Sequence, residues 1–228
     1  MFNDKIDSQV IGTLKIYDKD SGETLVQKKN AIHPGNMAYV LASALGGKAT
    51  SVNNVVGYVP HINWMAFGSG GSVSTTTLSY RSPRVNPTYD GYPISSSSSS
   101  LYVPKYEQLT TNTVYYPGQV IDATATPPVV VPNNTAKVNF QVEVSHAKYA
   151  ADTRQGGEEI PSSDSSPDAN AIAAFTFDEI GLLSGVHDSG YILDNTKTLM
   201  LTHVTFHPVL LSANRTIVID YTVTIQIS

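Results

Sequence analysis

The stretch IVIDYTVTIQI, residues 217–227, decides the fold class of this chain. Apolar side chains recur at every second position, and polar side chains fill most of the positions between them. Successive side chains of a β-strand point to opposite faces, so this alternation predicts a strand with one buried face. At about 3.4 Å per residue the strand would run roughly 35 Å, about twice the usual length. A strand of that length is expected to cross a whole β-sandwich.

Similar patterns predict further strands on both sides of a short central helix. Residues 10–17 alternate, 18–22 read as a turn, and 24–27 are expected to return as a hairpin partner. Other predicted strands cover 62–67, 138–144, 175–183 and 199–206. The helix is expected to begin at Pro34, where a first-turn proline is tolerated, and to stop at the glycine pair 46–47. Its predicted apolar stripe consists of Met37, Val40, Leu41, Ala44 and Leu45.

Two segments lack such periodicity. Residues from about 78 to 132 hold six consecutive serines and many prolines, and they are predicted to form a long Ser/Pro/Tyr-rich loop insertion. A second exposed loop is predicted at about 150–170. The first segment carries seven tyrosines, which are the candidate interaction residues: Tyr80, Tyr89, Tyr92, Tyr102, Tyr106, Tyr115 and Tyr116. We expect this segment to be an arm that becomes ordered on a neighbouring subunit, with a loop that has no partner as the alternative.

Six or more strands, one short helix and Gly/Pro/Ser-rich loops predict a mainly β fold. The natural packing is a β-sandwich or a jelly-roll-like arrangement, in a single β-rich domain over residues 1–228. Charged residues make up only 14% of the chain, against roughly 25% in an ordinary soluble domain. A surface poor in charge loses less solvation energy when another subunit covers it, which favours an assembly protein.

Composition also argues against several classes of function. The chain has no cysteine, which excludes disulfides and thiolate chemistry and fits synthesis in a reducing cytoplasm. A net charge of −5 without any basic run predicts no nucleic-acid binding. The first ten residues carry acids and lack an apolar core, so no secretory signal is expected there. No apolar run approaches the length of a membrane span, so no membrane insertion is expected.

No motif predicts a catalytic, cofactor or metal site. His203 and His207 lie four apart in a β-patterned segment, a spacing that separates them by about 13 Å, so a shared metal ion is not expected. Asp178 and Glu179 are adjacent, and neighbours on a strand should face opposite sides, so no shared site is expected there. The chain is therefore predicted not to be an enzyme, although a glycosidase that draws distant acids together stays an alternative.

Glu179 nevertheless has a predicted structural partner. It precedes an apolar strand in which Gly181 admits close backbone approach, and the glycine turn at 68–71 ends another predicted strand. We expect its carboxylate to accept hydrogen bonds from backbone N–H groups of such a turn. An exposed acid on an edge strand is the alternative.

Four segments, taken in order, resemble a family of tailed-bacteriophage virion proteins. They are NAIHPGN at 30–36 running into the helix, WMAFGSGG at 64–71, FDEIGLL at 177–183, and a closing pair of strands within 199–227. In that family an Asn-led helix, a strand ending in a Phe-Gly-x-Gly turn, a Glu-Ile-Gly-Leu strand and a final β-hairpin recur in this order. The resemblance covers about half of the chain, and the long Tyr/Ser/Pro-rich insertion departs from it.

The resemblance implies a non-enzymatic structural subunit of a virion, made in the host cytoplasm and placed at the neck or collar or in the tail or baseplate. Its expected partners are further copies of itself, as a trimer or ring, and other virion proteins. A capsid decoration protein is one alternative. A carbohydrate- or receptor-binding module of a tail fibre is another, because tyrosines stack on sugar faces. The resemblance implies no catalytic residue and no cofactor.

Overall fold

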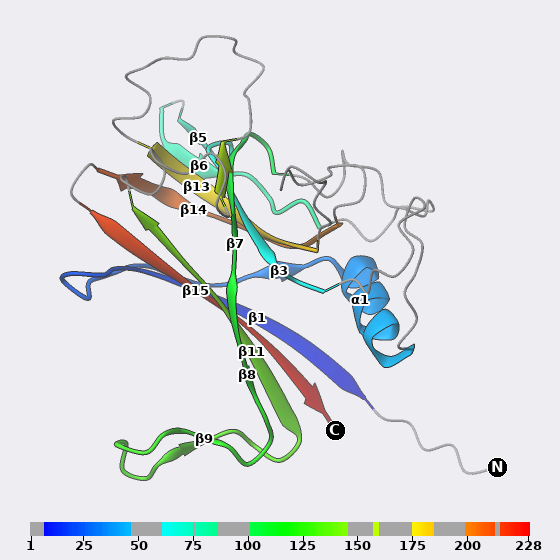
Figure 1. Cartoon of the computed structure of the whole chain (residues 1–228). Helices are drawn as coiled ribbons and strands as arrows, with labels where there is room; N and C mark the ends of the chain where they lie inside the picture. The colour runs from blue at the N-terminus through cyan, green and yellow to red at the C-terminus, as the bar shows by residue number, and fades with distance from the viewer. Residues whose placement is uncertain are drawn as a thin grey trace.

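The computed structural model describes residues 7–46, 61–74, 76–85, 101–145, 157–159, 175–184, 199–212 and 215–228 (Figure 1). Within these residues the chain forms two large antiparallel sheets, two small hairpins and one helix. The predicted mainly β, sandwich-like fold with a single short helix is confirmed.

The first large sheet has the strand order β2-β1-β15-β11-β8. Its strands are β1 (Ser8–Asp18), β2 (Thr24–Lys29), β8 (Thr111–Tyr115), β11 (Thr135–Ser145) and β15 (Thr216–Ile227). The decisive stretch forms β15, the central strand, which pairs along its length with β1 on one side and β11 on the other. Its predicted buried face is present from Ile217 to Val223, whereas Ile225 is half-buried and Ile227 is 51% exposed. The last residues of β15 therefore extend past the core.

The second large sheet has the strand order β12-β7-β4-β13-β14-β3. Its strands are β3 (Ala31–Ile32), β4 (Trp64–Gly68), β7 (Pro104–Leu109), β12 (Gly157–Glu159), β13 (Phe175–Ser184) and β14 (Leu199–Leu211). The small hairpins pair β5 (Ser72–Ser74) with β6 (Leu78–Tyr80), and β9 (Val120–Asp122) with β10 (Val129–Val130).

The main core lies between the two large sheets. It joins inward residues of the first sheet, such as Ile219 and Tyr221, to inward residues of the second, such as Phe67 and Phe206. The other face of the second sheet is covered too: Trp64 and Met200 belong to a second buried cluster that includes Leu101. Because both of its faces are buried, a polar side chain on the outer face of this sheet needs protein partners.

Helix α1 (Pro34–Gly46) begins and ends close to its predicted bounds. Its buried face differs from the predicted stripe, because Asn36 and Ser43 are buried with Met37 and Val40, while Leu45 is 90% exposed. The reason is an anchor at the N-terminus of the helix, where Asn36 Nδ2 donates to the carbonyl of Met200 at 2.7 Å and orients the helix on β14. No helix in the described parts of the chain is long and apolar enough to cross a membrane.

The prediction of a loop over residues 78–132 is wrong for much of that segment. β7 lies inside the second sheet between β12 and β4, and β8 forms an edge of the first sheet. The sequence PKYEQL of β7 buries Glu107 and Gln108 together with Tyr106, so it shows no alternation of apolar and polar residues. In the predicted loop at 150–170, residues 157–159 form β12, and the rest lies outside the described residues.

The expected closing hairpin is also absent. β14 belongs to the second sheet and β15 to the first, so these consecutive strands do not pair. Both edges of β15 are already occupied, by β1 and β11, which leaves no hydrogen-bonding edge for β14.

Candidate functional site

A break in the register of β13 brings Asp178 and Glu179 to the same side of the sheet. Phe177 and Ile180 both point into the main core, so the two residues between them point outward together. The pairing with β14 shifts at this point, between Phe177 and Glu179. The expectation that the two carboxylates face opposite sides is therefore wrong, because a bulge interrupts the regular alternation of a strand.

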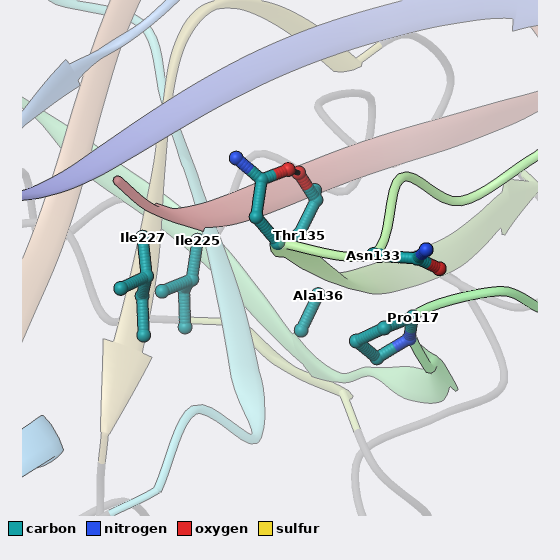
Figure 2. Close-up of a pocket in the computed structure, with 7 residues that line it drawn as sticks. Pro117, Asn133, Thr135, Ala136, Ile225 and Ile227 are labelled. Atoms are coloured by element: carbon teal, nitrogen blue, oxygen red, sulfur yellow. Dashed lines mark hydrogen bonds between the residues drawn. The ribbon is translucent and has the colours of Figure 1, made fainter.

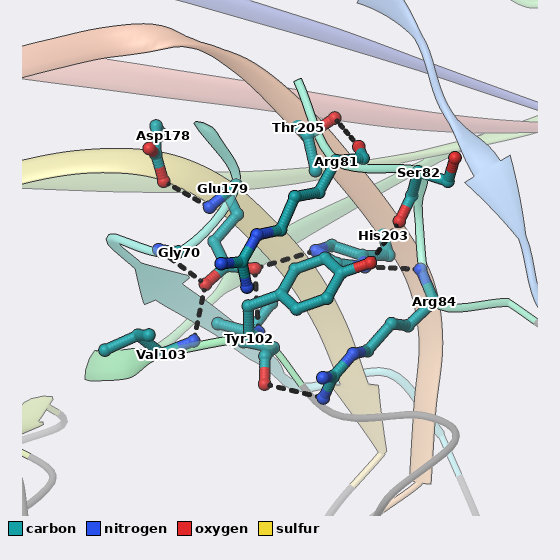
Figure 3. A network of polar contacts seen from close by, with 12 residues as sticks. Gly70, Arg81, Ser82, Arg84, Tyr102, Val103, Asp178, Glu179, His203 and Thr205 are labelled. Atoms are coloured by element: carbon teal, nitrogen blue, oxygen red, sulfur yellow. Dashed lines mark hydrogen bonds and ion pairs between the residues drawn. The ribbon is translucent and has the colours of Figure 1, made fainter. Parts of the chain in front are cut away.

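Glu179 is fully buried and accepts four hydrogen bonds (Figure 3). Its Oε1 accepts the backbone N–H groups of Gly70 at 3.0 Å and Val103 at 2.9 Å. Its Oε2 accepts the N–H of Tyr102 at 2.9 Å and contacts Nε2 of His203 at 3.0 Å. The predicted cap on the glycine turn is confirmed, and the alternative of an exposed acid on an edge strand is wrong.

Asp178 binds the next part of the same turn. Its Oδ1 accepts the N–H of Gly71 at 2.7 Å, and its Oδ2 accepts the N–H of Ser72 at 2.9 Å and the Ser72 hydroxyl. The two carboxylates together bind three consecutive backbone N–H groups, from residue 70 to residue 72. Glycine is required at Gly70, where an added Cβ would lie 2.6 Å from the Cβ of Tyr102.

The hydrogen bonds of His203 fix its protonation. Its Nδ1 lies 2.7 Å from the backbone N–H of Arg84 and must therefore be the acceptor. The other ring nitrogen, Nε2, then carries the proton and donates it to Glu179. A neutral imidazole thus binds a charged carboxylate, with both groups fully buried.

The Glu179 carboxyl remains charged inside the protein. Burial by itself raises its pKa, but hydrogen bonds from His203, Val103 and Tyr102 outweigh that effect and hold the pKa below its usual value. Backbone N–H groups therefore solvate this charge in place of water.

An aromatic and cationic layer covers the buried pair. The Tyr102 ring lies 5.8 Å from the His203 ring, and its hydroxyl donates to the carbonyl of Ser82 at 2.7 Å. The guanidinium groups of Arg84 and Arg81 lie 4.0 and 4.8 Å from the centre of the Tyr102 ring. This stacking, visible in Figure 3, separates the carboxylate from solvent.

The Glu179 carboxylate binds backbone and has no acceptor position left for a substrate or a metal. A carboxylate offers about four acceptor positions, and Glu179 uses four. Both ring nitrogens of His203 are occupied as well. Within the described residues, no group of three or more His, Cys, Asp or Glu side chains could hold a metal ion. The site ties the segments at 70–72, 84 and 101–103 to the face of the second sheet.

The structure separates the candidate tyrosines. Tyr102 covers the buried pair, Tyr80 and Tyr116 are 48% and 66% exposed, and Tyr115 is half-buried. Tyr106 lies in the main core at 1% exposure, and its hydroxyl lies 3.1 Å from Oε1 of Gln108. The prediction that Tyr106 takes part in a surface contact is therefore wrong. The remaining two, Tyr89 and Tyr92, lie outside the described residues.

Sequence reasoning considered His203 only as a metal ligand and missed its partnership with Glu179. A histidine on a strand with no nearby acid in sequence carries no signal of such a contact, because its partner comes from another strand. No protein-family model matches this chain, and no curated protein or solved structure is similar enough to count as a match.

Proposed function

We propose that this chain is a non-enzymatic structural subunit of a tailed-phage virion, placed at the neck or collar or in the tail or baseplate. One observation carries the proposal. Apart from β15, which lies in the first sheet, the segments that resemble the virion family fall on β3, β4, β13 and β14, and these are four neighbouring strands, in the order β4-β13-β14-β3, of the second sheet. Segments scattered over the sequence thus form one structural unit.

The contacts within that unit explain why the segments occur as a set. Glu179, from the third segment, accepts the N–H of Gly70 in the second. Asn36, from the first, donates to the carbonyl of Met200 in the fourth, and the N–H of His33 donates to the carbonyl of Leu201. Each segment needs another one for its buried polar groups, so a change in one requires a compensating change in another.

Two further features support a structural role. Glu179 is satisfied within the chain, by three backbone N–H groups and the His203 side chain, as expected for a framework element. The low charge content, 14% of residues, suits surfaces that are covered by neighbouring subunits.

The alternative of a glycan-binding module has less support. It rests on tyrosines gathered in one exposed loop, yet Tyr106 is a core residue and Tyr102 is stacked against two arginines. Sugar-binding platforms require aromatic faces that are open to solvent. Saturable binding to a glycan array would support this alternative.

The test is to find the protein in particles. Antibodies raised against the recombinant chain should label purified virions of the encoding phage at one defined position in immunogold electron microscopy, and mass spectrometry should find the chain at a fixed copy number. A chain that is absent from intact, purified particles contradicts the proposal. Label spread evenly over the capsid would favour the decoration alternative instead.

A further inference from the structure

A hairpin arm leaves the first sheet between β8 and β11. The arm, residues 116–134, contains β9 and β10 and lies at the end of the molecule opposite β5 and β6 (Figure 1). Backbone hydrogen bonds hold its base, from Gly118 N–H to the Val131 carbonyl at 2.8 Å and from Val131 N–H to the Gln119 carbonyl at 2.9 Å. The arm is therefore a preformed hairpin rather than a loose connection.

The arm presents apolar side chains to solvent. Its exposed apolar residues are Tyr116 (66%), Val120 (50%), Ile121 (37%), Val129 (43%) and Val130 (45%). Its one ionisable acid or base, Asp122, accepts hydrogen bonds from the N–H groups of Thr124 and Ala125. β-Branched apolar residues on a two-stranded ribbon with a single charged side chain are typical of a segment that docks elsewhere, because such a ribbon is marginally stable alone.

A groove lies at the root of the arm. This end groove has a volume of about 330 Å³ and is lined by Pro117, Asn133, Asn134, Thr135, Ala136, Ile225 and Ile227 (Figure 2). It exists because β15 extends past the core: Tyr221 is fully buried, whereas Ile227, on the same face, is 51% exposed. The lining of the end groove holds no charged side chain and is largely apolar.

We propose that the end groove binds the arm of a second copy of this chain. The arm cannot fill its own groove, because Pro117 and Asn133 are at once the root of the arm and the wall of the groove. Val120 and Val130 are accordingly exposed within one copy. Where two copies meet about a two-fold axis, each arm reaches the groove of the other, and both contacts form at once.

Size and charge agree with this occupant. A cavity of about 150 Å³ can hold a benzene molecule, so the end groove admits about two branched side chains of the arm. The apolar side chains of the arm and Ile227 are 37–66% exposed, which suits a small interface, below the about 800 Å² per partner of a standard one. The groove lining carries no charged side chain, and the one charge of the arm, Asp122, already accepts hydrogen bonds from Thr124 and Ala125 of its own turn. The inference deepens the proposed structural role by naming one partner of the chain.

The experiment uses the full chain and three variants, with mass measured by light scattering after size exclusion. The arm variant carries Val120→Asp and Val130→Asp, and the groove variant carries Ile227→Asp. The control variant, Leu210→Asp, adds the same charge at an exposed apolar position (48%) on β14. The wild type and the control are expected to be oligomeric at about 100 µM. The dissociation constant of each of the other two variants should be higher by a factor of at least about ten. Circular dichroism confirms that every variant is folded.

A mixture of the two dissociating variants gives the decisive result. The arm variant retains an intact groove and the groove variant retains an intact arm, so one of the two contacts can form between them, and mixed oligomers should appear. A monomeric wild type, an oligomeric arm variant, or a mixture that stays monomeric would each overturn the inference. These results are independent of particle labelling. A monomeric chain that is found in virions would contradict this inference and leave the proposed function intact. An oligomer that is absent from virions would contradict the proposed function.

Discussion

Replacing Glu179 by Gln should destabilise the protein strongly, although the two side chains have nearly the same shape. The substitution turns one acceptor oxygen into an NH₂ group, which can only donate. In one orientation this group faces the N–H groups of Gly70 and Val103, and in the other it faces Tyr102 and His203. His203 cannot adapt by moving its proton, because its Nδ1 must accept from a backbone N–H.

The magnitude follows from the donors that lose their acceptor. A buried donor without a partner costs about 1–3 kcal/mol, so two of them cost about 2–6 kcal/mol. Removal of the buried charge offsets part of this cost, which places the expected loss in the free energy of unfolding at about 3 kcal/mol. For a chain of this size the melting temperature should fall by about 6–12 °C.

Urea unfolding at neutral pH, followed by circular dichroism, measures this loss. Glu143→Gln is the matched control, because it removes the same charge from a side chain that is 45% exposed and bound only to Lys19 among the contacts described. The control should change the free energy of unfolding by less than about 1 kcal/mol. If Glu179→Gln is as stable as Glu143→Gln at an unchanged dependence on urea, the four hydrogen bonds do not hold the loops and the reasoning is wrong.

Three more predictions concern the same region. In the folded protein the pKa of Glu179 is below its ordinary value of 4.5, so the stabilising contribution of this carboxylate is present above pH 4.5 and is lost as the pH falls through the folded pKa. The loss of stability in acid should therefore be shallower in Glu179→Gln than in the wild type. Urea titrations at several pH values would measure it. His203→Phe should lower the free energy of unfolding by about 2–4 kcal/mol, since it removes one acceptor and one donor from a buried network, and an unchanged urea midpoint would contradict this. Gly70→Ala should lower the melting temperature, because its Cβ would lie 2.6 Å from the Cβ of Tyr102, whereas Gly46→Ala, with no atom within 4 Å of the added Cβ, should leave it nearly unchanged in the same scan.

Much of the fold could be predicted from local patterns in the sequence. The alternation over 217–227 identified the central strand β15, and Pro34 with the glycines after it bounded the helix, because these signals depend only on the period of the backbone and on capping. The contact between Glu179 and the glycine turn was also within reach, since an acid beside an apolar strand needs a donor and the turn offers several. The strand and the helix are determined by residues close together in the chain, whereas the Glu179 contact joins residues 109 positions apart and was predicted from the chemistry of its two ends.

Only the tertiary structure decided the remaining features. β7 joined a sheet although its buried Glu107 and Gln108 hide it from any search for alternation. The bulge at Asp178 turned two adjacent carboxylates toward one turn, and His203 found its acid on the neighbouring strand. β14 and β15 separated into different sheets because both edges of β15 were taken by β1 and β11. Local sequence sets which face of a strand is apolar, but the neighbours of a strand and the partners of its buried polar groups come from distant parts of the chain. Those choices are made by the competition for edges and hydrogen bonds in the folded protein.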